Sequence, residues 1–140
     1  MRFCSTSPEE TERIAYEFAA KLKAGDVVCM YGDLGAGKTA FVRGMARALG
    51  IDEHITSPTF TIVNEYCGKM PLYHFDVYRV ADPDEMYEIG YEEYIDGDGI
   101  TVIEWPQLIA DILPKSRSEV RIDRDYDKGE NCRSITIEKE

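Results

Sequence analysis

An eight-residue segment in the first third of the chain constrains its fold and chemistry more than any other feature. It reads Gly32-Asp33-Leu34-Gly35-Ala36-Gly37-Lys38-Thr39 and fits the phosphate-binding loop pattern G-x-x-x-x-G-K-[ST]. The apolar residues 27–31 before it predict a buried strand, and residues 38–49 after it have a helical pattern with Gly50 as the C-terminal cap. A glycine-rich turn before a helix is the simpler alternative. A chance match of the loop pattern together with this strand and helix is rare, which favours a phosphate-binding loop.

Each residue type in the loop has a chemical reason to be there. The glycines at positions 32, 35 and 37 let the backbone turn tightly and approach phosphates without a Cβ in the way. The backbone N–H groups and the helix N-terminus then hold a polyphosphate. Lys38 is expected to reach the β- and γ-phosphates, and the Thr39 hydroxyl is expected to bind Mg²⁺. All eight residues, Gly32 through Thr39, are therefore predicted to bind the nucleotide.

The charge balance limits the partners of the chain. Its 140 residues include 27 acidic and 16 basic ones, which gives a formal net charge of −11. Such a surface repels nucleic acid phosphates and anionic lipids, and no basic patch stands out that would bind tRNA or DNA directly. No apolar run approaches transmembrane length, and the N-terminus has no apolar region typical of a signal peptide. We expect a cytoplasmic protein with no membrane contact.

Length and cysteine spacing predict the domain organisation. At this length the chain is expected to form a single domain over residues 1–140, with a core of its own. The four cysteines are scattered and include no C-x-x-C pair. They indicate free thiols in a reducing compartment, and neither a zinc site nor a disulfide framework, at Cys4, Cys29, Cys67 and Cys132.

Local signals predict the elements on either side of the loop. Ser7-Pro8-Glu9-Glu10 has the pattern of a capping box, and apolar residues at helical spacing continue from it to a helix end near Gly25. Residues 60–67 alternate and predict a strand, and residues 72–80 predict a returning strand that forms a hairpin with it. A short helix is predicted over residues 82–90.

The second half of the chain completes an α/β pattern. Asp96-Gly97-Asp98-Gly99 lacks the terminal glutamate and the spacing of a calcium loop, and predicts a turn into a buried strand at residues 100–103. Residues 106–113 indicate another helix, and residues 119–124 and 133–138 indicate a hairpin. Together the elements predict a P-loop NTPase-like fold, with a partly parallel sheet flanked by helices and antiparallel strands at an edge.

A carboxylate that binds magnesium is expected at the carboxyl end of a buried strand beside the loop. Glu104 directly follows the strand at residues 100–103 and meets this requirement; a solvated strand-end glutamate is the alternative. Asp76 is the second candidate, because it could orient the attacking water or a magnesium-bound water. Its alternative role is to fix Arg79 or a turn.

The two histidines, His54 and His74, do not make a zinc site. His74 lies two residues before Asp76, on the same face of its strand, whereas Phe75 and Val77 lie on the other face. We expect His74 to be packed or hydrogen-bonded.

Four segments in this order resemble one family, and together they are specific. They are the loop at residues 32–39, Ser57-Pro58-Thr59-Phe60, His74-Phe75-Asp76-Val77-Tyr78-Arg79 and Glu104-Trp105-Pro106. The chain resembles the TsaE family of small bacterial ATPases, which are needed to make threonylcarbamoyladenosine on tRNA. The resemblance runs from the first helix to Pro114, and the tail beyond it matches weakly.

The resemblance implies an ATPase, with ATP and Mg²⁺ as cofactors, that works with the TsaB and TsaD proteins. Those partners carry the transfer chemistry to adenosine 37 of tRNA, and this chain is not itself the transferase. Direct tRNA binding by the chain is not expected.

The resemblance also implies roles for particular residues. Lys38, Asp76 and Glu104 are implied to be the catalytic residues, with Thr39 and Glu104 as the magnesium ligands. Trp105 is implied to lie beside the nucleotide, and Thr59 to sense the γ-phosphate. Ala40 departs from the family pattern, because many relatives carry a second threonine there that commonly contacts the α-phosphate in phosphate-loop proteins.

Two other function classes stay open on the residues alone. A small-molecule phosphotransferase would need an arginine-rich lid and an acceptor pocket, but the arginines of this chain are scattered. A nucleotide-dependent regulatory switch of the GTPase kind would carry N-K-x-D, and the only comparable segment, Asn64-Glu65-Tyr66-Cys67, does not match it.

Overall fold

The computed structural model describes residues 1–33, 35–58, 61–129 and 131–139. The strands over these residues are β1 (Arg2–Ser5), β2 (Val27–Tyr31), β3 (Val63–Tyr66), β4 (Leu72–Asp76), β5 (Ile100–Glu104), β6 (Ser118–Arg124) and β7 (Arg133–Lys139). The helices are α1 (Pro8–Ala19), α2 (Lys38–Ala48), α3 (Asp84–Glu88), α4 (Tyr91–Ile95) and two 3₁₀ helices, η1 (Pro106–Ile112) and η2 (Tyr126–Lys128). No helix of the described ranges is long and apolar enough to cross a bilayer.

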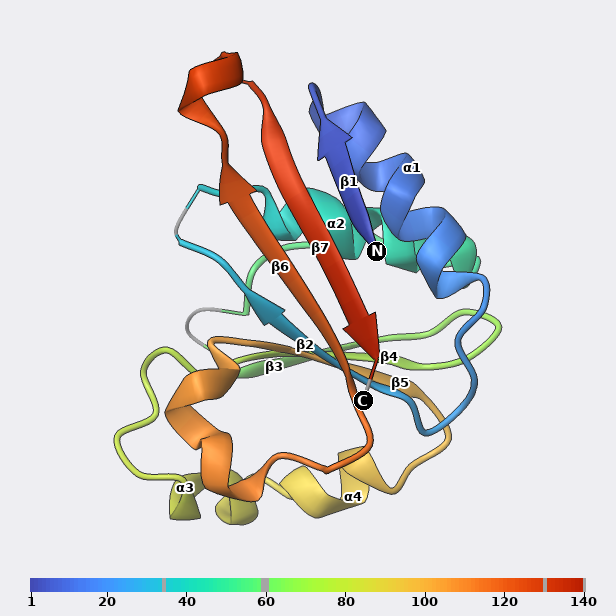
Figure 1. Cartoon of the computed structure of the whole chain (residues 1–140). Helices are drawn as coiled ribbons and strands as arrows, with labels where there is room; N and C mark the ends of the chain where they lie inside the picture. The colour runs from blue at the N-terminus through green and yellow to red at the C-terminus, as the bar shows by residue number, and fades with distance from the viewer. Residues whose placement is uncertain (34, 59–60, 130, 140) are drawn as a thin grey trace.

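The strands form one mixed sheet in the order β1-β7-β6-β2-β5-β4-β3 (Figure 1). The four central strands β6, β2, β5 and β4 run parallel, whereas β7 pairs antiparallel with both β1 and β6, and β3 pairs antiparallel with β4. The predicted α/β fold with a partly parallel sheet is therefore confirmed. Antiparallel strands lie at both edges, because β7 and β1 extend the parallel core beyond β6 and β3 extends it beyond β4.

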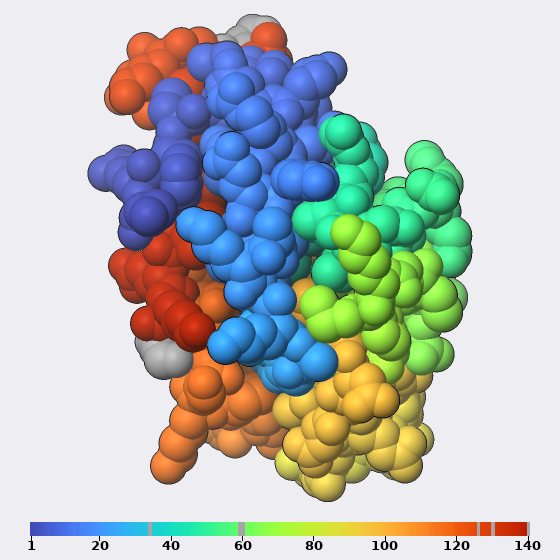
Figure 2. Space-filling view, turned by 90° about the vertical axis from the view of Figure 1, so that its right-hand side faces the viewer, coloured from blue at the N-terminus to red at the C-terminus, as the bar shows by residue number. Residues whose placement is uncertain are grey.

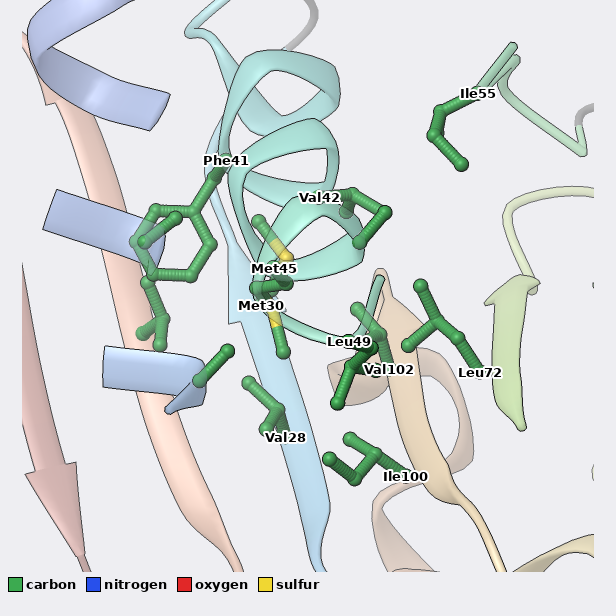
Figure 3. Packing of buried hydrophobic residues seen from close by; sticks show 14 of the residues in the cluster. Val28, Met30, Phe41, Val42, Met45, Leu49, Ile55, Leu72, Ile100 and Val102 are labelled. Atoms are coloured by element: carbon green, nitrogen blue, oxygen red, sulfur yellow. The ribbon is translucent and has the colours of Figure 1, made fainter. Parts of the chain in front are cut away.

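The central strands are buried on both faces, as their continuous apolar runs predict. Alternate residues of β2 point to opposite sides, so Val28 and Met30 join one core cluster while Val27 and Cys29 join another. The first cluster lies between the sheet and the helices α1 and α2, and it includes Phe41 of α2 (Figure 3). The second contains residues of α3, α4 and η1, which cover the opposite face (Figure 1).

Helix α1 packs very closely on α2. A Cβ built on Gly44 of α2 would lie 2.1 Å from the backbone oxygen of Glu12 and 2.8 Å from the Cβ of Ala15. Only glycine permits this approach, because the backbone of α1 occupies the space of any side chain. Figure 2 shows α1 running down one face of the molecule with residues of α2 beside it. The contact fixes α1 against the helix that follows the glycine loop.

The predicted helices are present, but some are shorter or of a different type than expected. The Ser7 side chain accepts a hydrogen bond from the Glu10 N–H at 3.1 Å and caps α1, but this helix ends at Ala19, well before Gly25. Residues 106–112 form a 3₁₀ helix, with non-helical backbone angles at Ile109. Helix α4 was not predicted, and it follows α3 directly after the left-handed Gly90.

Both predicted strands of the central hairpin are shorter than expected. Strand β3 begins at Val63 rather than at residue 60, because Thr61 lies in a turn and Ile62 has a φ of 69°. Residues 59 and 60 lie outside the described residues. Strand β4 ends at Asp76 rather than at residue 80, because the Tyr78 N–H donates to the Asp76 carboxylate at 3.0 Å and turns the chain.

None of the four cysteines forms a disulfide, but they are not all far apart. Strand β1, which the sequence did not indicate, pairs with β7 and brings the Sγ of Cys4 to 3.2 Å from the Sγ of Cys132. The turn at residues 96–99 is confirmed, since it connects α4 to β5 without regular structure.

Candidate nucleotide-binding site

The glycine loop connects β2 to α2, as its pattern predicts. Gly35 and Gly37 have φ values of 78° and 110°, which place both in the left-handed region. Gly32 has a φ of 153°, and a Cβ at this position would lie 2.6 Å from the backbone oxygen of Ile122 in β6. The glycines are thus required both by backbone angle and by close approach of a neighbouring strand. Leu34 lies outside the described residues.

A cavity of about 490 Å³ lies against this loop. The residues that line it include Gly35, Gly37, Lys38, Thr39, Ser57, Asp76, Glu104 and Trp105. The structure therefore brings the predicted lysine, threonine, carboxylates and tryptophan together from three separate segments. Asp33 is exposed and Ala36 is buried, and neither lines the cavity in this conformation.

Sheet register explains why the two carboxylates meet. Asp76 and Glu104 are paired residues at the carboxyl ends of the parallel strands β4 and β5, and Glu104 is also paired with Met30 of β2. The glycine loop leaves β2 two residues after Met30, at the same edge of the sheet. In open α/β sheets ligands bind at this edge, and here both acids point toward the α2 side.

Glu104 lies at the centre of a buried charged cluster. Its Oε1 lies 3.6 Å from the Nζ of Lys38, and its Oε2 lies 2.5 Å from the Nε2 of His74. The exposed fractions of Lys38, His74 and Glu104 are only 6%, 0% and 4%. Burial by itself raises the pKa of the Glu104 carboxyl, but the His74 hydrogen bond and the charges of His74 and Lys38 outweigh it and hold this pKa below its ordinary value. Glu104 is therefore a carboxylate at neutral pH, and the expected hydrogen bond of His74 is confirmed.

Lys38 has an unusual environment for a buried ammonium. Its Nζ has no hydrogen-bond partner among the described residues, and it lies 4.1 Å from the ring centroid of Trp105. Glu104 supplies a counter-charge but no hydrogen bond, and a buried ammonium without hydrogen-bond acceptors is unfavourable unless a ligand supplies them. Phosphate oxygens in the adjoining cavity would do so, and this lysine therefore fits a polyphosphate ligand.

Trp105 is held in a conformation that non-glycine residues rarely adopt. Its φ of 62° is left-handed, and it directly precedes η1. The ring contacts the Tyr78 ring at a centroid distance of 4.9 Å, and both rings border the cavity. Such backbone strain tends to occur at functional sites, where the surrounding structure enforces it. The strained turn places the indole directly over the loop lysine.

Asp76 has a different set of contacts from Glu104. Its carboxylate accepts hydrogen bonds from the Tyr78 N–H at 3.0 Å and from the Ser57 hydroxyl at 3.4 Å. The alternative of an aspartate that fixes a turn is thus part of its role. The same carboxylate still lines the cavity, and it remains available to a water molecule there.

The oxygen donors of the site fit magnesium. Thr39 and Glu104 offer a hydroxyl and a carboxylate to one cavity, and Mg²⁺ prefers oxygen ligands with few protein groups. A zinc site from the two histidines is not formed, because His74 binds Glu104 and His54 lines another cavity beside Asp52 and Glu53. Within the described ranges no three His, Cys, Asp or Glu side chains group around one point.

Sequence reasoning missed several residues at the site. Pro8 and Arg43 line the cavity next to Ala40, on the side of α1. Arg124 and Arg133 contact the loop backbone from the tail, 89 and 97 residues away along the chain. No local pattern marks such residues, because only the register of the sheet brings them to the loop. Thr59, the expected γ-phosphate sensor, lies outside the described residues.

Taken together, the mixed sheet, the glycine loop and the helix that begins with lysine and threonine define a phosphate-loop α/β protein. The family model for the threonylcarbamoyl adenosine biosynthesis protein TsaE matches residues 5–135, and the chain therefore belongs to the TsaE family. The match includes all of β6 and the first residues of β7, beyond the region where the resemblance was visible in the sequence.

Relatives and a solved structure agree with this assignment. The chain is 46% identical to the tRNA threonylcarbamoyladenosine biosynthesis protein TsaE of Bacillus subtilis, over 98% of this chain and 84% of that protein. It is 46% identical to the TsaE of Treponema pallidum, over 82% of this chain and 85% of that protein. The crystal structure of Bacillus subtilis YdiB superimposes with a TM-score of 0.83 at 42% identity, and the match covers 98% of this chain and 83% of that chain.

Proposed function

We propose that this protein binds and hydrolyses ATP in the pathway that makes threonylcarbamoyladenosine at position 37 of tRNA, together with the TsaB and TsaD proteins. Family membership supports the place in tRNA modification. The observation that carries the ATPase is the buried Lys38 ammonium, which has no hydrogen-bond acceptor among the described residues and lies in a cavity that two carboxylates also line. Four cysteines that form no disulfide suit the reducing cytosol as the site of this activity.

The residues divide the chemistry among them. Lys38 would bind the β- and γ-phosphate oxygens and neutralise charge that develops as the bond to the γ-phosphorus breaks. Thr39 and Glu104 would hold Mg²⁺, which supplies further charge neutralisation when bound. Asp76 would orient the attacking water and accept its proton. Trp105 would cover the nucleotide phosphates and exclude bulk water from the lysine.

Ala40 changes one contact of this scheme without changing the rest. A methyl group at this place offers no hydroxyl to the α-phosphate, although the backbone N–H in the first turn of α2 remains. Ala40 is buried and lines the cavity, so the nucleotide would still pass next to it.

Partner dependence follows from what the site lacks. Charge on the γ-phosphoryl oxygens is commonly neutralised by an arginine in addition to the loop lysine. Among the described lining residues, Arg43 is the only arginine, and it comes from the second turn of α2, on the side of Ala40 and Pro8. We therefore expect slow hydrolysis by the isolated protein and faster hydrolysis when TsaB and TsaD complete the site.

Phosphate release from purified components tests the proposal. The protein alone should turn over ATP slowly in the presence of Mg²⁺, and the TsaB–TsaD pair should stimulate it clearly. A Lys38→Ala variant should stay inactive in both mixtures, and the isolated protein should show no measurable tRNA binding at physiological salt. Fast hydrolysis that the pair leaves unchanged would refute the proposed role.

A further inference from the structure

The tail hairpin supports the glycine loop from outside the cavity. Strand β6 lies parallel to β2, with Arg121 paired to Tyr31, so the residues after Arg121 run beside the start of the loop. The close approach of Gly32 to the Ile122 oxygen is the first consequence of this arrangement. The hairpin therefore contacts the loop itself, at Gly32, Gly35 and Ala36, and not only the strand before it.

Two arginines at the end of this hairpin bind the loop backbone. Arg124 donates through Nη2 to the carbonyl oxygen of Gly35 at 2.8 Å, and Arg133 donates through Nε to the carbonyl oxygen of Ala36 at 2.9 Å. Both are short, charge-assisted hydrogen bonds to successive peptide groups. The two cations thus lie next to the backbone of the loop that connects β2 to α2.

Hairpin stability does not explain this placement. Arg124 and Arg133 are direct cross-strand partners in the register of β6 and β7. Like charges directly opposite each other destabilise a strand pair. Arg133 also donates to the Cys132 carbonyl within the hairpin, but the contact that the two guanidinium groups share is with the backbone of the loop.

Peptide geometry connects the two hydrogen bonds to phosphate binding. In a trans peptide the C=O and the following N–H point in opposite directions. Fixing the Ala36 carbonyl on Arg133 therefore directs the Gly37 N–H away from that arginine. The hydrogen bond from Arg124 to the Gly35 carbonyl likewise directs the Ala36 N–H away from Arg124. This N–H donates to the Asp33 oxygen at 3.1 Å and closes a turn within the loop. Both peptide orientations are set before any ligand arrives.

We propose that Arg124 and Arg133 are positioning residues that hold the phosphate loop in its polyphosphate-binding shape. The inference rests on the proposed nucleotide function of the loop, and it adds a second role, because two cations behind the loop also favour an anionic ligand on a strongly acidic protein. The tail hairpin is on this view part of the binding site and not only an edge of the sheet.

Amide hydrogen exchange in the absence of nucleotide tests the holding role directly. The variants are Arg124→Gln, Arg133→Gln and the double variant, with Arg47→Gln as a charge-matched control, since Arg47 lies in the last turn of α2 and pairs with Glu12. In the double variant the loop amides, and the Ala36 amide above all, should exchange about tenfold faster or more. In the control variant their exchange rates should stay unchanged. Amides within β6 and β7 away from residues 124 and 133 should keep their protection.

Calorimetry with ADP and ATP provides the second readout. The double variant should bind both nucleotides about tenfold more weakly, because the loop must be ordered at the moment of binding. Turnover at saturating ATP should change less than the affinity. An Arg133→Lys variant should recover only part of the affinity, because a lysine keeps the charge but not the planar, directed donors.

The outcomes separate this inference from the proposed function. If the loop amides exchange in the double variant as in the parent protein, the holding role is wrong, whatever the nucleotide affinity. If the exchange rises but the parent protein binds no nucleotide, the holding role stands and the nucleotide function fails. Full recovery of affinity in Arg133→Lys would show that charge alone matters. If the double variant does not fold, the single variant Arg124→Gln serves for the same measurement, because Arg124 is exposed and its replacement should not disturb the core.

Discussion

Asp76 and Glu104 are paired residues on adjacent parallel strands, yet their carboxylates have separate environments. Glu104 contacts a lysine and a histidine, whereas Asp76 accepts hydrogen bonds from a backbone N–H and a serine hydroxyl. Neighbouring carboxylates with different surroundings can take different roles in one reaction. The pair thus has the arrangement expected for one acid that binds metal and one that acts on water.

An Asp76→Asn variant tests the role at the water. The asparagine side chain still offers an oxygen to the Tyr78 N–H, so the turn after β4 should be kept. Turnover should fall by about 100-fold or more, because a proton acceptor is lost, while ATP affinity stays within a few-fold. Phosphate release and calorimetry on the same preparation measure both quantities. Normal hydrolysis by the variant would return Asp76 to a purely structural role.

A Glu104→Gln variant tests the role at the metal. Amide oxygens bind Mg²⁺ more weakly than carboxylates, so hydrolysis should be suppressed and ATP binding should lose most of its dependence on magnesium. Binding measured with a chelator should change less than binding measured with Mg²⁺. Equal losses in the two conditions would count against Glu104 as a magnesium ligand and would leave it as the counter-charge of Lys38.

Replacement of the loop lysine tests the phosphate site. The Lys38→Ala substitution removes the ammonium that lies over Trp105 and against Glu104. ATP affinity should fall roughly tenfold or more, which corresponds to about 1.4 kcal/mol upwards. A Lys21→Ala variant is the control, because Lys21 is exposed just beyond the end of α1. An unchanged affinity in Lys38→Ala by calorimetry would refute the assignment of the loop.

Gly44→Ala tests the contact between α1 and α2. In an ordinary helix interior this change stabilises by roughly 1 kcal/mol. Here the new Cβ would overlap the Glu12 backbone, so we expect a destabilisation of about 1–3 kcal/mol instead. Urea unfolding measures the free energy, with Glu17→Ala on an exposed part of α1 as the reference. A stabilised Gly44→Ala protein would show that the two helices can separate without penalty.

Elements with strong local signals were predictable from the sequence. The glycine loop, the buried strand that ends at Glu104 and the tail hairpin each carry their own local pattern, and all three are present. Strand β1 carries no such pattern, because its four residues become a strand only by pairing with β7 at the other end of the chain. Tertiary pairing of this kind overrides local propensity.

The site was predictable in its chemistry but less so in its contacts. Residue types at fixed spacing indicated Lys38, Thr39 and Glu104 as cavity residues. The contacts of Lys38 with Trp105 and of Glu104 with His74 depend on a strained backbone turn and on the register of two strands. Neither can be read from spacing alone, because a shift of one residue in register would send the same side chains to the other face of the sheet.

The pairing of the first strand with the last has a consequence for the order of folding. Strands β2, β4 and β5, with the loop between β2 and α2, can pair once residue 104 has been synthesised. The arginines that contact the loop lie at the end of β6 and the start of β7, and β1 has no partner until β7 exists. During synthesis the loop at residues 32–39 is therefore made well before the two arginines that contact it. On our proposal, a ribosome-bound chain that lacks the tail hairpin carries a loop that is not yet held in its binding conformation.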